Sequence, residues 1–131
     1  MDELRRRAVL LDANVFVTPV RRDFLFRLHV SELPFRFVWS ERIAGEALRN
    51  VGKPFRNDPD KTRLHVAAHE LVFARFPEGY VSDWESLESS CGNDPGDRHV
   101  LAAARAAKAT VIVTENVRHF LPEHLEPWGI R

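Results

Sequence analysis

Residues 93–120 read NDPGDRHVLAAARAAKATVIVTENVRHF and contain a helix pattern followed by a strand pattern. Residues 95–108 predict an amphipathic helix, because apolar residues recur there at helical spacing. These apolar positions are Val100, Leu101, Ala104 and Ala107. Residues 110–114, TVIVT, are rich in β-branched side chains and predict a strand. A helix that leads directly into a strand is typical of an α/β protein.

The rest of the chain continues this alternation of strands and helices. Further strands are expected at residues 8–12, 35–39 and, more weakly, 80–84. Further helices are expected at residues 21–30, 41–51, 58–76 and 122–126. Ser40 is the expected N-cap of the helix at 41–51. Along 58–76, Leu64, Ala67 and Ala68 follow the period of a buried helix face. We therefore expect an α/β fold, in which a parallel β-sheet is sandwiched between α-helices, and one domain over residues 1–131.

The composition is that of an ordinary globular protein. The 131 residues are 44% hydrophobic and 29% charged, and the net charge is zero, so the chain as a whole has no strong field that attracts nucleic acid. A lone cysteine, Cys91, excludes an internal disulfide framework and a cysteine-based zinc cluster. No apolar run is long enough to span a bilayer, and Asp12 interrupts the first apolar run, which excludes a signal peptide. A cytoplasmic protein without a membrane segment is expected.

Acidic residues follow or flank the predicted strands. Asp12 ends the first strand, and Asp94 and Asp97 open the helix before the last strand. Glu46 lies on the flank of the apolar side of the helix at 41–51. Ligands of open parallel sheets bind outside the carboxyl ends of the strands. We therefore expect Asp12, Glu46 and Asp97 to converge there.

Converging carboxylates repel one another, and a divalent cation relieves that repulsion. Mg²⁺ or Mn²⁺ prefers oxygen ligands and assists phosphodiester hydrolysis. The pattern therefore indicates a metal-dependent nuclease. Asp94 followed by Pro95 is also a good helix start, so a capping role remains open for Asp94, and Asp97 is suited both to the helix dipole and to a metal.

Other site patterns receive little support. His65 and His69 are four residues apart, but the segment HVAAH lacks the glutamate of zinc proteases. The sequence contains no Gly-rich phosphate loop and no Gly-x-Ser-x-Gly elbow. A Mg²⁺ phosphotransfer site is disfavoured, because Asp12 is followed by Ala13 and Asn14 rather than by a second aspartate.

Four segments of the sequence together resemble the PIN domain, specifically the VapC-like toxin-type proteins. They are LLDANVFVTPVRRDFLFRL, VWSERIAGEALRN, FPEGYV and the segment NDPGDRHVLAAARAAKATVIVTENVRHF. The resemblance implies a Mg²⁺- or Mn²⁺-dependent endoribonuclease that hydrolyses RNA phosphodiester bonds. It also implies a toxin that pairs with an antitoxin protein and forms a homodimer.

The same resemblance assigns roles to individual residues. Asp12, Glu46 and Asp97 correspond to the catalytic, metal-binding acids of the family, and Asp94 to an accessory metal ligand. Thr114 corresponds to a threonine that orients the last part of the site. The sequence departs from the family at Asn116 and His119, which are not acidic.

This departure leaves two hypotheses open. In the first, the chain is a ribonuclease whose activity is reduced by Asn116 and His119. In the second, it is a catalytically impaired PIN-fold module that binds RNA or protein. Basic residues on predicted helices are candidate contacts for the RNA backbone: Arg21, Arg22, Arg42 and Arg49.

Overall fold

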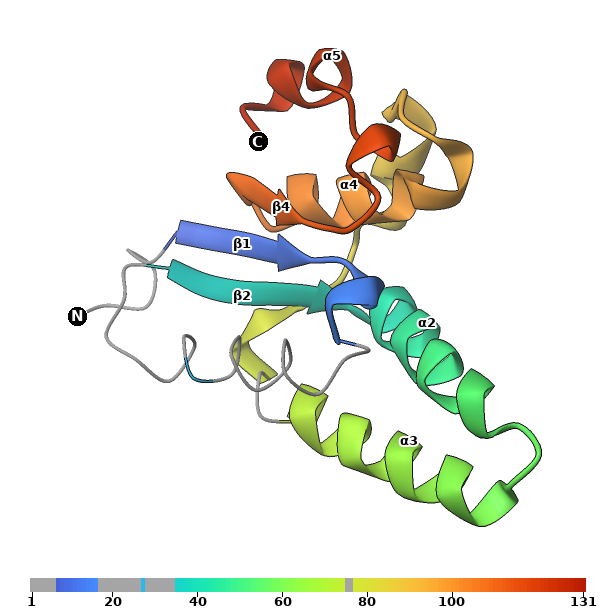
Figure 1. Cartoon of the computed structure of the whole chain (residues 1–131). Coiled ribbons are helices and arrows are strands. Elements are labelled where there is room, and N and C mark those ends of the chain that lie inside the picture. The colour runs from blue at the N-terminus through green and yellow to red at the C-terminus, as the bar shows by residue number, and fades with distance from the viewer. Residues whose placement is uncertain (1–6, 17–26, 28–34, 75–76) are drawn as a thin grey trace.

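The computed structural model describes residues 7–16, 27, 35–74 and 77–131 of the chain. The predicted helix at 21–30 lies outside this part except for Arg27, and so do Arg21 and Arg22. Four described strands form one parallel sheet in the order β3-β2-β1-β4 (Figure 1). They are β1 (Arg7–Leu11), β2 (Phe35–Ser40), β3 (Tyr80–Val81) and β4 (Val111–Val113). The described α-helices are α2 (Glu41–Gly52), α3 (Pro59–Ala74), α4 (Arg98–Ala106) and α5 (Pro122–Leu125). The predicted parallel α/β fold is confirmed.

The sheet is built around β1, which pairs with β2 on one side and with β4 on the other. Leu10 lies beside Val38 and Ile112 in the register, and the side chains of Leu10 and Val38 are fully buried. All strand pairings are parallel, so the strands end at a common edge, which we call the carboxyl edge. Asp12 and Thr114, which follow β1 and β4, are therefore brought together at this edge.

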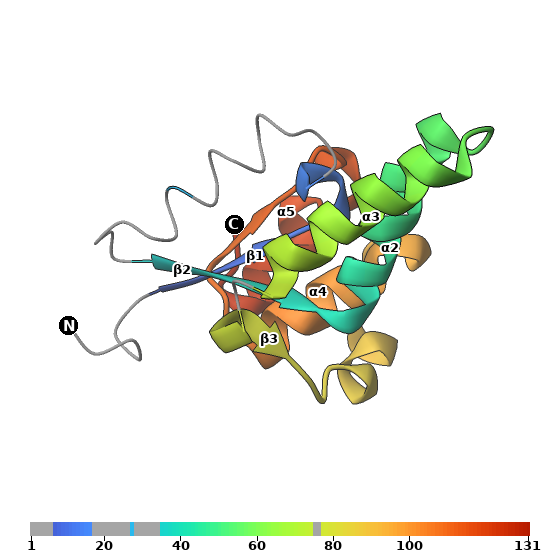
Figure 2. The ribbon, with the colours of Figure 1, turned by 90° about the horizontal axis from the view of Figure 1, so that it is seen from below.

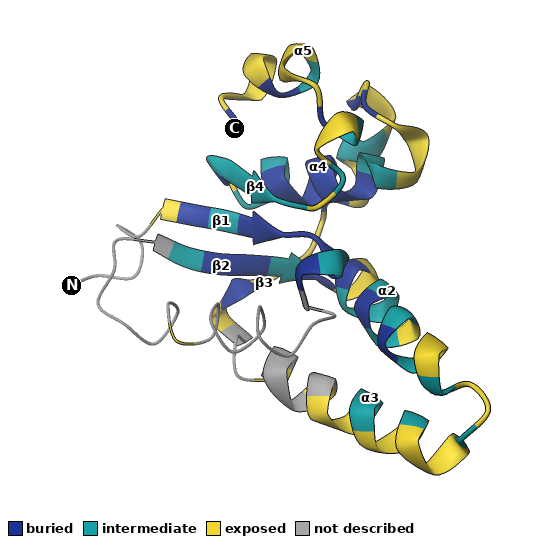
Figure 3. Ribbon diagram, in the orientation of Figure 1, coloured by how far each residue is buried: buried dark blue, intermediate teal, exposed yellow. Residues whose placement is uncertain are grey.

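Helix α4 packs against β1, β2 and β4 and is buried more completely than its sequence pattern predicts. Every residue from His99 to Ala104 is buried, and the visible part of α4 in Figure 3 is largely dark blue. The 3₁₀ helix Glu85–Ser90 also packs against α4. Alanine side chains allow this close packing, because they extend little from the helix.

The start of α4 differs from the prediction. A helix was expected from residue 95, but residues Pro95–Asp97 form a 3₁₀ turn and α4 begins at Arg98. Asp97 has φ −114° and ψ 10°, which is not helical backbone, so the turn and the helix are separate elements. Asp97 therefore lies at a junction rather than inside a helix.

Helices α2 and α3 lie side by side and project from the carboxyl edge of the sheet (Figures 1 and 2). Ser40 is the N-cap of α2, as predicted: its Oγ accepts a hydrogen bond from the Ile43 N–H at 3.2 Å. The predicted burial of α3 is wrong for Leu64, Ala67 and Ala68, which are exposed, Leu64 by 71%. The cause is that α3 packs mainly along α2, so these residues have no cover within the described part of the chain.

Gly79 offers a test of the packing between β2 and the segment that leads into β3. A Cβ atom added at Gly79 would lie 2.1 Å from the Phe37 carbonyl oxygen, which is backbone and cannot rotate away. We expect Gly79→Ala to lower the free energy of unfolding by about 1–3 kcal/mol, as overpacking does elsewhere. Urea unfolding monitored by circular dichroism measures this change.

Gly45→Ala is the matched control. A Cβ at Gly45 meets the Arg49 Nη1 at 3.6 Å, an ordinary contact, and Gly45 lies inside α2. Alanine is favoured over glycine in a helix by about 0.8–1 kcal/mol, so this variant should be as stable as the wild type or more so. Equal unfolding midpoints for the two variants would contradict the close approach at Gly79.

Candidate active site

Asp12 is the buried carboxylate of the carboxyl edge. Its backbone N–H donates to the Val113 carbonyl at 3.0 Å, so the β1–β4 pairing continues to this residue. The residue is only 2% exposed. Its Oδ1 accepts from the Ala13 N–H and its Oδ2 accepts from the Thr114 hydroxyl, each at 2.7 Å. These hydrogen bonds fix the orientation of the carboxylate and offset part of the cost of burying it.

Thr114 joins Asp12 to the segment that follows β4. Besides donating to Asp12, its Oγ1 accepts from the Asn116 N–H at 3.0 Å and from the Asn14 side-chain amide at 3.5 Å. The Asn14 Oδ1 accepts from the Glu115 N–H at 3.1 Å. Thr114 therefore contacts Asp12 directly, and the backbone of Asn116 is held within the same network.

The 3₁₀ turn before α4 presents two carboxylates with different local roles. Asp94 caps the turn, because its Oδ1 accepts from the Gly96 N–H at 3.1 Å. Asp97 occupies the N-cap position of α4 but makes no side-chain capping bond there. Its Oδ2 instead lies 2.6 Å from the Nδ1 of His119. The capping interpretation is therefore confirmed for Asp94, and Asp97 lies at the start of α4 with its carboxylate directed to His119.

Glu46 contacts His99 across the gap between α2 and α4. Its Oε1 lies 3.0 Å from the His99 Nε2 and 3.9 Å from the Arg42 Nε. Neither ring nitrogen of His99 has a well-aligned hydrogen-bond partner among the described residues, so the 3.0 Å approach is a close polar contact. Burial lowers the pKa of His99, and the charge of Arg42 lowers it further. The neutral imidazole is therefore favoured.

The carboxylates of Asp12, Glu46 and Asp97 are close enough to influence one another. Burial raises the pKa of Asp12 above its ordinary value, and repulsion from Asp97 and Glu46 adds to this against the opposing hydrogen bonds. Burial also raises the pKa of Glu46, where repulsion from Asp97 acts against attraction by Arg42. Asp97 contributes to both shifts, so the three predicted acids form one electrostatic group.

The donor set suits a divalent cation. One ligand atom from each of Asp94, Asp97 and His119 lies within 4.8 Å of the others. Asp12 and Glu46 are coupled to this triad through their repulsion with Asp97. Carboxylate oxygens are the ligands that hard cations prefer, and a bound cation would remove the repulsion among them.

A sequence model of the PIN domain matches residues 8–118 of the chain. The chain belongs to the PIN domain family. It is also similar to a Mycobacterium tuberculosis protein named "Putative ribonuclease VapC50", with 37% identity over 83 residues. That alignment covers 63% of this chain and 46% of the relative, so the chain spans less than half of the relative's length. No solved structure matches the chain.

Two residues that contact the acids of this PIN domain were given no role by the sequence analysis. His99 is fully buried beside Glu46, and Asn93 is 2% exposed, with its side-chain amide donating to the Asp97 carbonyl at 3.0 Å. The available signal was a histidine inside an otherwise apolar helix face and an asparagine directly before Asp94.

The arginines predicted to contact RNA have different surroundings. Arg42 lies 3.5 Å from Glu88 and 3.9 Å from Glu46, so it takes part in ion pairs within the PIN domain. Arg49 lines an open groove between α2 and α3. Three further basic residues line the same groove: Lys53, Arg56 and Arg63. We call these four residues and the apolar surface between them the α2–α3 groove.

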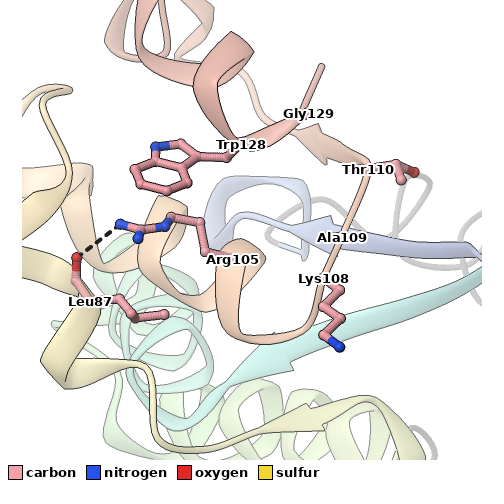
Figure 4. A pocket seen from close by; sticks show the side chains of 7 residues that line it. All are labelled: Leu87, Arg105, Lys108, Ala109, Thr110, Trp128 and Gly129. Atoms are coloured by element: carbon pink, nitrogen blue, oxygen red, sulfur yellow. Dashed lines mark hydrogen bonds between the residues drawn. The ribbon is translucent and has the colours of Figure 1, made fainter.

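A pocket of about 390 Å³ lies away from the acidic residues (Figure 4). Ala109 and Thr110, which line it, precede β4 and therefore lie at the opposite edge of the sheet from Thr114. The Arg105 guanidinium lies 3.5 Å from the centre of the Trp128 ring and donates to the Leu87 carbonyl at 3.2 Å. This cation–π contact attaches the C-terminal segment to α4.

The raised pKa of Asp12 predicts a dependence of stability on pH. A carboxyl group whose pKa is raised by folding binds its proton more tightly in the folded state. The free energy of unfolding therefore falls as the pH rises from the ordinary value of 3.8 through the higher folded value. Asp12→Asn removes this titration and keeps an acceptor for the Ala13 N–H.

In the presence of a chelator, we expect Asp12→Asn to have a higher melting temperature than the wild type at pH 7. The difference should shrink as the pH falls toward 3.8, because the carboxyl of folded Asp12 gains its proton above that value. Thermal unfolding followed over this pH range measures both effects. A variant that is less stable than the wild type at pH 7 would show that the hydrogen bonds to Asp12 outweigh its desolvation.

Proposed function

We propose that this chain is a metal-dependent endoribonuclease that hydrolyses RNA phosphodiester bonds. The observation that carries this proposal is the electrostatic group of Asp12, Glu46 and Asp97 at the carboxyl edge of a PIN domain. Such a group is costly unless it binds a cation, and costly charge clusters are typical of functional sites. The name of the M. tuberculosis relative assigns a ribonuclease to that protein and supports the same class here.

In this proposal, Asp12, Glu46 and Asp97 hold a Mg²⁺ or Mn²⁺ ion, and Asp94 assists them. When bound, such an ion activates a water and stabilises the negative charge that develops on the phosphodiester. Asp97 has the central place, because it is the acid that both other carboxylates repel.

Neighbouring groups orient these acids. The Thr114 hydroxyl and the Ala13 N–H fix the two oxygens of Asp12 at 2.7 Å. His99 contacts Glu46 at 3.0 Å from the buried side of α4. Preorientation of this kind lets the acids act without rearrangement when the substrate arrives.

The α2–α3 groove is the proposed contact surface for the RNA backbone. Arg49 and Glu46 both belong to α2, so the groove begins on the helix that carries one of the acids. Its basic residues offset the lack of net positive charge on the chain, because phosphate contacts depend on local charge. Arg42 also remains a proposed RNA contact. Its ion pairs with Glu46 and Glu88 would compete with an RNA phosphate for its guanidinium.

The partners of the protein are also proposals. The similarity to a VapC-type relative favours an antitoxin protein as partner, with the chain as toxin, and the family resemblance favours a homodimer. A cytoplasmic location is proposed on the same resemblance. No helix among the described residues has the length and apolar character to cross a membrane.

The second candidate function is an RNA- or protein-binding PIN module without turnover. It is favoured by the non-acidic residues Asn116 and His119, which stand where the family resemblance places acids. Their positions next to Thr114 and Asp97 give them direct influence on the site.

The central test is RNA cleavage by the metal-loaded protein. We expect the wild type to cleave a labelled RNA panel in Mn²⁺ or Mg²⁺, and EDTA to abolish cleavage. Asp97→Asn should reduce the rate by at least about 100-fold, because a metal ligand and a nearby negative charge are both lost. Gel analysis of single-turnover reactions measures the rate.

Asp83→Asn provides the matched control, since it makes the same chemical change at an exposed residue that follows β3 and does not line the α2–α3 groove. It should leave the cleavage rate unchanged. Metal-independent cleavage, or equal rates for the two variants, would contradict the nuclease site. Absence of cleavage by a folded wild type would favour the binding module.

The α2–α3 groove is tested by the salt dependence of RNA binding. In an Asp97→Asn background that keeps RNA intact, Lys53→Gln with Arg56→Gln should weaken binding. The slope of the logarithm of the binding constant against the logarithm of salt concentration should fall by about 0.7 for each lost phosphate contact. Fluorescence anisotropy at several salt concentrations measures this slope.

Lys108→Gln is the control, because Lys108 is exposed and lines the pocket at the opposite edge of the sheet. It should leave both affinity and slope unchanged. An unchanged slope in the Lys53 and Arg56 double variant would remove the groove from the RNA path.

A further inference from the structure

We propose that His119 is a direct metal ligand beside Asp94 and Asp97, and that its imidazole makes this site prefer Mn²⁺ over Mg²⁺. The inference rests on the proposed metal dependence and specifies which ion the site selects. His119 stands where the family resemblance places an acid. Metal binding by His119 is therefore a separate proposal from metal binding by Asp12, Glu46 and Asp97.

The first observation is the convergence of unlike donors. The ligand atoms of Asp94, Asp97 and His119 lie within 4.8 Å of one another, and the His119 Nδ1 is 2.6 Å from an oxygen of Asp97. With metal–ligand bonds of about 2.1 Å, ligands in an octahedral shell lie about 3–4 Å apart. Ligand atoms that already lie this close together can enclose an ion after small side-chain movements.

The second observation is that His119 is held firmly in place. Its backbone N–H donates to the Asn116 carbonyl at 2.9 Å, within the 3₁₀ turn Val117–His119. The next residue, Phe120, is buried in the core. The turn is also connected to Asp12, because the Asn116 N–H donates to Thr114. The imidazole is therefore positioned by the fold from both sides.

The nature of the donor determines which ion is favoured. Mg²⁺ selects oxygen ligands, whereas Mn²⁺, a first-row transition metal, shares that affinity for carboxylates and accepts an imidazole nitrogen more readily than Mg²⁺ does. The capping bond of Asp94 uses its Oδ1, so the second carboxylate oxygen of Asp94 can bind a metal ion while the cap is kept. A site of two carboxylates and one imidazole thus binds Mn²⁺ with all its donors and Mg²⁺ with fewer.

Binding to metal-free protein tests the inference without any RNA. Mn²⁺ binding is measured by the loss of the free-ion signal in electron paramagnetic resonance, with Mg²⁺ as competitor. Second-shell partners alone contribute about 10–100-fold to metal affinity, so loss of a direct ligand should cost at least about tenfold. His119→Asp replaces the imidazole by a carboxylate that Mg²⁺ also accepts, so the Mn²⁺ over Mg²⁺ preference should fall by at least about tenfold.

A spectroscopic signature separates ligation from a merely structural role. Electron spin-echo modulation of bound Mn²⁺ should show ¹⁴N coupling in the wild type and lose it in His119→Asp. His65 lies on α3, where its ring stacks on Phe55, and it is not among the ligand atoms of the triad; His65→Asp is therefore the control and should retain the coupling and the preference. Circular dichroism of each variant confirms that it is folded.

The outcomes distinguish this inference from the proposed function. Bound Mn²⁺ without ¹⁴N coupling in the wild type, or an unchanged ion preference in His119→Asp, overturns the role of His119. Coupling and selectivity without RNA cleavage support the inference and count against the nuclease. Metal-dependent cleavage with equal use of both ions supports the nuclease and overturns the inference.

Discussion

The burial of one ionisable carboxylate, Asp12, constrains everything around it. Its two oxygens each accept one hydrogen bond, and the bond from Thr114 crosses from the end of β1 to the end of β4. This fixed charge then repels Asp97, which lies in the turn before α4, and Glu46, which lies on α2. Without a cation, the fold therefore carries an electrostatic cost at its carboxyl edge. Active sites commonly accept such a cost, because the same charges are needed for function.

Predictions that depend on neighbouring residues were the successful ones. The apolar run before Asp12 forms β1, Ser40 caps α2, and the β-branched run before Thr114 forms β4. Each of these follows from side-chain period or from one local hydrogen bond. Because parallel strands end at one edge, the meeting of Asp12 and Thr114 was also predictable. The metal-ligand roles of Asp12, Glu46 and Asp97 stay predictions.

Features that depend on distant packing were missed. The inward face assigned to α3 is wrong at Leu64, because a helix pattern does not reveal that the α2–α3 pair leaves the sheet. The contact between Asp97 and His119 joins residues 22 positions apart, through a turn that no periodicity predicts. His99 was passed over for a similar reason. His99 matters because it contacts Glu46, and Glu46 lies on another helix that the local sequence around His99 does not reveal.

The loop that carries Asp97 is already closed by its own hydrogen bonds. The Asn93 side chain donates to the Asp97 carbonyl, the Asp97 N–H donates to the Asp94 carbonyl, and the Arg98 side chain donates to the Asn93 carbonyl. Ordering one residue of a free chain costs about 1–2 kcal/mol. Here that entropy is lost when the protein folds rather than when a ligand binds. The affinity of this loop for an ion is therefore determined by charge and donor chemistry, with little contribution from loop closure.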